Sequence, residues 1–394
     1  MKRLKTKRIL ATLPATLIIA ALLALNLAGC RPAAAQETSD QSTATEITAA
    51  ETSEEAAEDT KADTGVEEFN PDDFGKDRIT GNINMLTGIE LSSAVLAQRP
   101  IAIMVENTPD ARPQSGLISA DVVYEVVDEA GITRFVAVFS SQDSDMVGPV
   151  RSARPYYAEI AASFDPVYIF WGTHPNFYKI ISDLGIDYLF PVTKPDMSYP
   201  LIGNFDDPGS GEGKDAIRDT TRVAPHNAYV RIPRMREIAE SLGYSADGGQ
   251  TSFYFKEDAP ESERGNISDI TVNFSSNTFK VDFKYDSATN KYLRYCADAP
   301  SMDRESGEQI SVNNVLVLFT DIRNSGNKEG HMIIRTTQGG DAYYFLDGNV
   351  VEGTWGRYSA LDPFEFKDKD GKPVLINRGQ TWVVMISGIE QLEY

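Results

Sequence analysis

The chain has 394 residues with a formal net charge of −21, and 41% of its residues are hydrophobic. This length and apolar content allow about two globular domains with real cores. The acidic balance, with no basic stripe interleaved with aromatics, gives no indication of nucleic-acid binding. With only two cysteines, Cys30 and Cys296, we expect neither a disulfide framework nor a thiolate metal site.

The first thirty residues have the pattern of a bacterial lipoprotein signal. A basic start precedes an uncharged apolar run at 9–27, and the sequence Leu-Ala-Gly-Cys ends at Cys30. An ordinary secretory signal ends in small residues without the thiol, whereas a thiol can carry thioether-linked lipid beside acyl chains such as palmitate. We expect residues 1–29 to be a signal peptide and Cys30 to anchor the protein in the cell membrane, on its extracytoplasmic side. The alternative is an uncleaved transmembrane anchor, which also predicts tethering outside the cytoplasm.

Residues 30–76 are expected to form a disordered acidic linker. Between Arg31 and Phe74 there are thirteen acidic and two basic residues, a net charge of −11, with few aromatics. Such a segment cannot bury enough apolar surface to offset its conformational entropy. About half of the charge excess therefore lies in the linker, where self-repulsion favours an extended chain.

Residues 77–256 combine strand and helix patterns. Buried or alternating apolar runs predict strands at 100–105, 121–127, 132–139 and 167–171. Helical patterns occur at 156–164, 177–184 and 231–242. The segment 194–223 is polar and rich in Pro and Gly, and it is predicted to be a long loop. These features indicate a mixed α/β N-terminal domain.

Residues 266–394 show strand patterns without helices, beyond a polar boundary at 257–266. The predicted strands lie at 270–274, 278–285, 291–296, 312–320, 331–336, 342–346, 349–355 and 381–386. Asp347-Gly348 and Asp370-Gly371 are tight-turn signals. The predicted fold class is therefore α+β, with a mixed α/β N-terminal domain followed by a small, mostly-β C-terminal domain.

A series of motifs in fixed order resembles the YerB-like lipoproteins of Gram-positive bacteria. These motifs are RPIAIMVEN at 99–107, DARPQSGL at 110–117, ADVVYE at 120–125, GITRF at 131–135, VGPVRSARP at 147–155, APHN at 224–227, GTW at 353–355 and GQTW at 379–382. The resemblance covers the chain from about residue 77 to its end. It implies layered sheets in the first domain and a distinct C-terminal domain. It implies no activity, because the family is one of unknown function, so function must be argued from residues.

Polar side chains gather at predicted strand ends and loops of the first domain. The candidate ligand-binding residues are Glu106, Asn107, Arg134, Arg151, Arg154, Arg218, Asp219, His226 and Asn227. Such positions let side chains converge on solvent without opening a core. We expect Arg151, Arg154 and His226, with Glu106 and Asn107 nearby, to line one cleft.

The arginines have two possible roles. The planar guanidinium suits carboxylate or phosphate, and Arg151 and Arg154 could share one anion at the entry to a helix, whose N-terminus attracts the same charge. Alternatively, these arginines pair with nearby carboxylates and brace a loop-rich edge. The sequence leaves both roles open.

His226 could act in acid–base chemistry, because imidazole titrates near neutral pH. A structural hydrogen bond to the backbone is the alternative. No two of His174, His226 and His331 share a metal-ligand spacing, so no metal and no cofactor is predicted. Cys296 lies on a predicted strand and is expected to be a buried apolar residue. Trp171, Trp355 and Trp382 could stack on sugars, but aromatics in strand patterns favour the core.

Two classes of function follow. The first is a membrane-anchored binding protein of the cell envelope, which holds an anionic or glycan ligand or a partner protein. The second is an envelope hydrolase that uses His226 and a carboxylate such as Glu106 or Asp219. The sequence favours the first, because no nucleophile–base constellation is complete.

Overall fold

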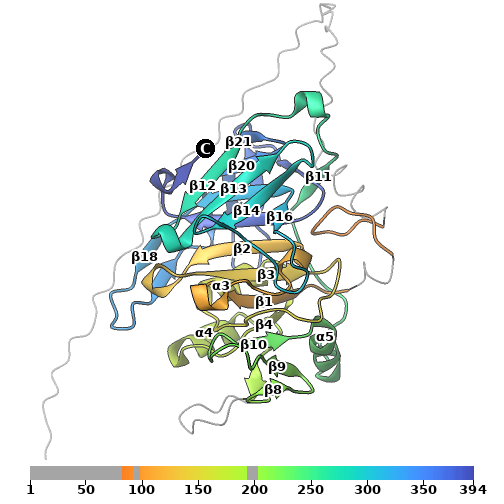
Figure 1. Ribbon diagram of the computed structural model, residues 1–394, viewed down its shortest axis with the longest axis vertical. Coiled ribbons are helices and arrows are strands. Elements are labelled where there is room, and N and C mark those ends of the chain that lie inside the picture. The colour runs from red at the N-terminus through yellow and green to blue at the C-terminus, as the bar shows by residue number, and fades with distance from the viewer. Residues whose placement is uncertain (1–81, 93–97, 193–202) are drawn as a thin grey trace, which may run out of the picture. The chain divides into compact units, whose positions relative to one another are not determined.

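The structure is a computed structural model that describes residues 82–92, 98–192 and 203–394 (Figure 1). The predicted signal peptide, Cys30 and the acidic linker at 30–76 lie outside the described residues and remain predictions. Within the described ranges, no helix is long and apolar enough to cross a membrane.

A ten-stranded sheet forms the centre of the fold, with strand order β22-β21-β20-β17-β24-β2-β3-β1-β4-β5. Its N-terminal strands are β1 (Ile101–Glu106), β2 (Val122–Val127), β3 (Thr133–Phe139), β4 (Val167–Ile169) and β5 (Tyr188–Leu189). Its C-terminal strands are β17 (Asn314–Phe319), β20 (Gln338–Leu346), β21 (Asn349–Arg357), β22 (Glu365–Asp368) and β24 (Thr381–Ile386). The two halves of the chain therefore share one sheet.

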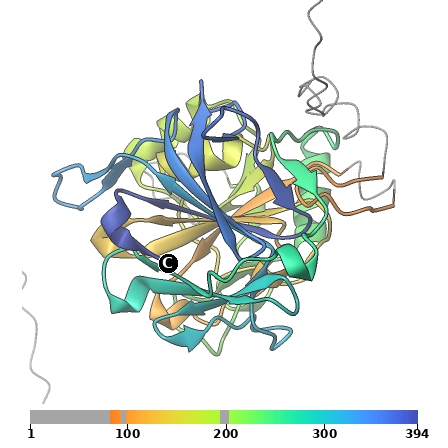
Figure 2. The ribbon, with the colours of Figure 1, turned by 90° about the horizontal axis from the view of Figure 1, so that it is seen from above.

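The two halves meet where β2 pairs with β24 in parallel. The register runs from Val122 opposite Thr381 to Val126 opposite Met385, and β24 pairs with β17 on its other side. Every residue of β2 and β24 is buried. In Figure 2 the orange strands of the N-terminal half and the blue strands of the C-terminal half can be followed across this junction. The sequence predicted both strands but not their pairing.

The central strands have continuous apolar sequences because both faces of the sheet are covered. On one face, the Tyr157 hydroxyl of α3 (Pro155–Ala162) donates to the Val126 carbonyl at 2.9 Å. On the other face, Phe283 of a second sheet contacts Trp382 of β24. Layers on each side exclude water from the middle of the molecule, where hydrophobic burial is worth most.

The second sheet has strand order β15-β14-β13-β12-β25, and β16 also pairs with β14 (Figure 1). Its strands are β12 (Asp269–Asn273), β13 (Lys280–Asp286), β14 (Lys291–Cys296), β15 (Ala299–Pro300), β16 (Ser311–Val312) and β25 (Leu392–Glu393). In β14 every second residue is buried, as expected for a strand with one face on a core. Cys296 ends that strand as a buried free cysteine, which confirms its predicted apolar role.

Smaller elements complete the fold. The remaining helices are α4 (Pro175–Asp183) and α5 (Ile232–Ser241), and the small sheets use β6 (Pro191–Val192), β7 (Phe205–Asp206), β8 (Gly211–Glu212), β9 (Ala216–Arg218), β10 (Ala228–Val230), β11 (Tyr254–Lys256), β18 (Ile322–Asn324), β19 (Met332–Ile334) and β23 (Leu375–Asn377).

The predicted α+β class and the mostly-β C-terminal part are confirmed. The segment 194–223 is not entirely loop, because β7, β8 and β9 lie in it; such short strands carry too little periodicity to be predicted.

The shared sheet predicts that both halves unfold together. Replacing Met385, which is fully buried between β2 and β17, with Ala should cost about 2–5 kcal/mol of unfolding free energy because it leaves a cavity. Hydrogen exchange measured by mass spectrometry should then show an equal loss of protection in β3 and in β20. Loss confined to β20 would contradict one cooperative unit.

Candidate functional site

The candidate site lies at the ends of the strands in the central sheet, where β1 ends and β3 begins. Glu106 is the last residue of β1 and lies opposite Arg134 near the start of β3. The segment around Pro149 runs between β1 and β10, since Glu106 N–H donates to the Pro149 carbonyl and Val150 N–H donates to the Ala228 carbonyl. This arrangement carries Arg151 and the residues just before β10 to the end of β1.

Three side chains, those of Thr108, Arg151 and His226, meet at the Glu106 carboxylate, and we call the four residues together the Glu106 cluster. The Oε1 atom of Glu106 lies 2.9 Å from His226 Nδ1 and accepts a hydrogen bond of 3.0 Å from the Thr108 hydroxyl. Arg151 Nε lies 3.3 Å from the same oxygen. The structure thus brings together three of the nine predicted residues and the carboxylate–imidazole pair named for the hydrolase.

The Glu106 cluster is buried at its base and open at its top. The Glu106 side chain is 1% exposed, whereas those of Arg151 and His226 are 25% and 20% exposed. On the solvent side, His226 Nε2 lies 4.0 Å from the Oδ2 atom of Asp110, a residue that is 81% exposed. One imidazole nitrogen therefore lies beside a buried carboxylate, and the other faces an exposed carboxylate at the surface.

Two polar atoms of the cluster lack hydrogen-bond partners. Glu106 Oε2 and Arg151 Nε are buried and make no hydrogen bond to any described residue. Burial lowers the pKa of Arg151, the Glu106 charge raises it, and the nearby Arg134 and Arg154 charges lower it again. Buried groups of this kind are normally satisfied by protein, water or ligand.

Asn107 points away from the cluster, into the interior. Its side-chain amide donates to Thr133 Oγ1 at 2.7 Å and to Glu125 Oε1 at 3.3 Å. The other Glu125 oxygen accepts from Arg294 at 2.8 Å. Asn107 therefore belongs to a buried network that joins the two sheets, and it supports the cluster from below.

Arg134 and Arg154 are ion-paired with neighbouring carboxylates. Arg134 Nη2 lies 2.7 Å from Asp128, and Arg154 Nε lies 2.6 Å from Glu129, with all four side chains at most 18% exposed. Burial raises the pKa of Glu129, but hydrogen bonds with Arg154 and Asp128 and the charges of Arg154 and Arg134 outweigh it and bring the pKa to about 2. These two arginines brace the sheet edge, as the second of the two proposed roles predicts.

Arg218, Asp219 and Asn227 form a separate group on β9 and β10. Arg218 makes two hydrogen bonds to Asp207, at 2.8 and 3.0 Å, and one to Asn227 at 3.1 Å. Its guanidinium lies over the Trp171 ring, 4.3 Å from the centroid. Asp219 pairs with Arg304 of the C-terminal half. This group holds the β8–β9–β10 sheet in place and has no contact with Glu106 among the described residues.

The sequence analysis missed several contributors to the site. Thr108 directly follows Glu106 and Asn107, and Asp110 lies two residues further along the chain, so proximity in sequence was the available signal. Arg294 occupies an inward position of an alternating strand, and an arginine there indicates a buried partner. Among the described residues, no group of three His, Cys, Asp or Glu side chains could hold a metal ion.

Comparison with known proteins identifies the family to which this layered α+β fold belongs. The model of the "protein of unknown function (DUF3048) N-terminal domain" matches residues 86–245, and that of its C-terminal domain matches residues 270–383. The chain belongs to the DUF3048 family, which confirms the resemblance to YerB-like proteins.

A sequence comparison and a structure comparison, both with YerB from Bacillus subtilis, support this assignment. The Bacillus subtilis protein named "Putative lipoprotein YerB" is 31% identical over 310 residues, which are 77% of this chain and 86% of that protein. A crystal structure of the YerB protein from Bacillus subtilis matches with a TM-score of 0.66 and 27% identity, over 79% of this chain and 98% of that chain. The similarity therefore extends through both halves.

The low pKa of Glu129 predicts a pH-dependent contribution to stability. Because the pKa falls from 4.5 to about 2 on folding, the ionised carboxyl stabilises the protein above pH 4.5, and this effect is lost as the pH falls through 2. Glu129→Gln should thus lower the unfolding free energy at pH 6 by at most about 3 kcal/mol.

Urea denaturation at pH 6, 4 and 2 measures this contribution. The difference between the wild type and Glu129→Gln should shrink toward zero at pH 2, because the unfolded carboxyl is then protonated and the folded one is about half protonated. A difference in unfolding free energy that is the same at all three pH values would show that the charge of Glu129 does not stabilise the fold.

Proposed function

We propose that the chain is a lipid-anchored protein on the extracytoplasmic side of the cell membrane. The basic and apolar start that ends at Cys30 supports this location, as does similarity to a relative that is named a lipoprotein. Each buried CH₂ contributes about 0.8 kcal/mol, so two or three acyl chains at one cysteine would hold the protein stably. The acidic linker at 30–76 would then separate the folded part from the bilayer.

Replacing Cys30 with Ala tests the anchor. The variant should move from the membrane fraction to the soluble or secreted fraction, because the thiol that carries the lipid is gone. Replacing Cys296, the buried cysteine of β14, with Ala is the matched control and should leave fractionation unchanged. Equal membrane retention of the Cys30 variant and the wild type would exclude lipidation as the anchor.

We further propose that the Glu106 cluster binds the anionic group of an envelope ligand, borne by a glycan or a partner protein. The observation that carries this proposal is that Arg151 and His226 converge on one buried carboxylate while Arg151 Nε has no hydrogen-bond partner. A phosphate or carboxylate would supply the missing acceptor for the planar guanidinium.

Titration with inorganic phosphate tests this site. Arg151→Met should weaken phosphate binding at least tenfold in calorimetry, because it keeps an apolar stem in place of the arginine methylenes and removes the guanidinium donors. Arg323→Met, at an exposed arginine of β18, is the matched control and should bind as the wild type does. Equal affinity of the two variants would contradict an anion site at Arg151.

An envelope hydrolase is the second candidate, favoured by the distance of 2.9 Å between Glu106 and His226 Nδ1. A carboxylate at Nδ1 fixes the imidazole and leaves Nε2 as a general base, the arrangement used in catalytic triads. The exposed Nε2 could then activate a water molecule. Turnover of ester, amide or phosphodiester probes that vanishes in His226→Ala would favour this candidate, and binding without turnover would favour the first.

A further inference from the structure

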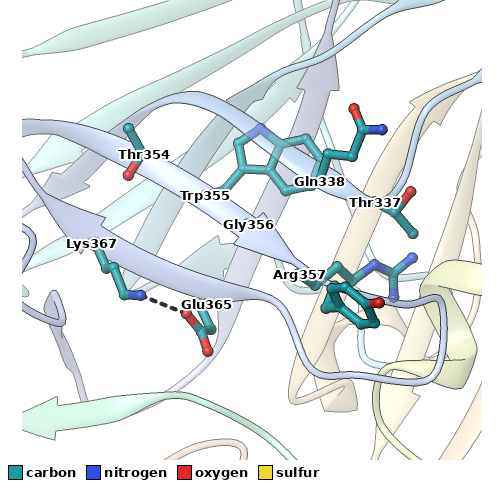
Figure 3. Close-up of a pocket in the computed structure, with 9 residues that line it drawn as sticks. Thr337, Gln338, Thr354, Trp355, Gly356, Arg357, Glu365 and Lys367 are labelled. Atoms are coloured by element: carbon teal, nitrogen blue, oxygen red, sulfur yellow. Dashed lines mark hydrogen bonds and ion pairs between the residues drawn. The ribbon is translucent and has the colours of Figure 1, made fainter. Parts of the chain in front are cut away.

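A groove of about 710 Å³ lies on the C-terminal half, over β20, β21 and β22 (Figure 3). Its lining residues are Thr337, Gln338, Thr354, Trp355, Gly356, Arg357, Tyr358, Glu365 and Lys367. Its volume is within the range of about 300–1,000 Å³ that accommodates small-molecule ligands. β21 and β1 are separated by five strands in the sheet order. At about 4.8 Å per strand spacing, the groove is roughly 29 Å from the Glu106 cluster.

Strand register explains why this face is hollow. Gly356 of β21 lies directly opposite Gly339 of β20 on one side and Glu365 of β22 on the other. Directly opposite residues share a face of the sheet, so two neighbouring positions of this face have no side chain. Trp355 lies on the opposite face and is buried in the core. The groove therefore has a floor of backbone.

The rim of the groove is polar and almost neutral. Lys367 Nζ lies 2.7 Å from Glu365, so these two charges offset one another (Figure 3). Thr337, Gln338 and Thr354 add uncharged donors and acceptors. Beside them the Tyr358 side chain is 96% exposed, the most exposed of the large hydrophobic residues in the described part of the chain. A ring kept in water offers a flat apolar surface next to a row of hydrogen-bonding groups.

Arg357, which also borders the groove, is a buried cation. Arg357 is 4% exposed and lies over the Phe364 ring, and its Nη2 atom has no hydrogen-bond partner among the described residues. Its guanidinium donates hydrogen bonds to backbone carbonyls, including those of Thr336 and Ala360. Burial lowers the pKa of Arg357 to about 10, only partly offset by nearby acidic groups. Arg357 therefore braces the end of β21 and places no exposed charge in the groove.

We propose that this groove binds a neutral polysaccharide chain, with one sugar ring on Tyr358 and its hydroxyls on the polar rim. Sugars combine an apolar ring face with a belt of hydroxyls, and the groove combines an aromatic face with uncharged polar groups. Gly356 lines the groove without a side chain, so a flat ring can approach the backbone there. The inference uses the proposed extracytoplasmic location, where polysaccharide is accessible, but not the anion site.

Binding of glycan probes by the full chain in mild detergent tests the proposal. The probes are chitohexaose, cellohexaose and protease-treated Gram-positive sacculi. Tyr358→Ala should weaken binding at least tenfold without lowering the melting temperature, because this side chain is almost fully exposed. Thr354→Trp, which fills the groove from an exposed position, should do the same. Tyr394→Ala, at a tyrosine 51% exposed and outside the groove, is the matched control.

The outcomes separate this site from the anion site. Arg151→Met should leave glycan binding unchanged even if phosphate binding is lost, and Tyr358→Ala should leave phosphate binding unchanged. Failure of all three probes to bind, or equal binding by Tyr358→Ala and the wild type, would overturn the proposal. Binding to sacculi that is lost on protease treatment would overturn it in favour of a protein partner.

Discussion

The buried ion pair between Glu125 and Arg294 is the interaction on which the rest of the fold depends. Both side chains are at most 2% exposed, and they join β2 of the central sheet to β14 of the second sheet at 2.8 Å. Trp382 of β24 donates to the same carboxylate at 3.1 Å, and Thr133 of β3 donates to its other oxygen at 2.9 Å. One carboxylate thus links four strands from both halves. Removing one partner of such a pair costs about 3–5 kcal/mol, because the remaining charge stays buried.

The same network sets the position of the Glu106 cluster. Asn107, which follows Glu106 directly, donates to Glu125, so the chain leaves β1 in a fixed direction. Arg112 and Gln114 both donate to the Asn107 side-chain oxygen, at 3.0 Å each. A buried network of this kind acts as a scaffold for the partly open group above it. Arg134 and Arg154 each form a close ion pair with a carboxylate, whereas the Nε atom of Arg151 makes no hydrogen bond to a described residue.

The sequence was sufficient for most local structure and for part of the site. Apolar runs predicted β1, β2, β3 and β24 because burial on both faces leaves a direct trace in composition. The position of Glu106 and His226 at element ends was also visible. The parallel pairing of β2 with β24 was not, since strands about 260 residues apart carry no local signal of their partner. The ion pairs of Arg134 and Arg154 were open for a similar reason: their carboxylates were present in the sequence, but charge alone does not specify which cation they contact.

The site depends most directly on the hydrogen bond between His226 and Glu106, and the ¹⁵N chemical shifts of the imidazole show whether it forms. The chain has only three histidines, so ¹⁵N chemical shifts of His226 can be assigned by substitution of His174 and His331. With Glu106 ionised, its oxygen can only accept, so neutral His226 should carry its proton on Nδ1. Glu106→Gln should shift this equilibrium. A neutral His226 protonated on Nε2, with ¹⁵N shifts unchanged in Glu106→Gln, would contradict the account.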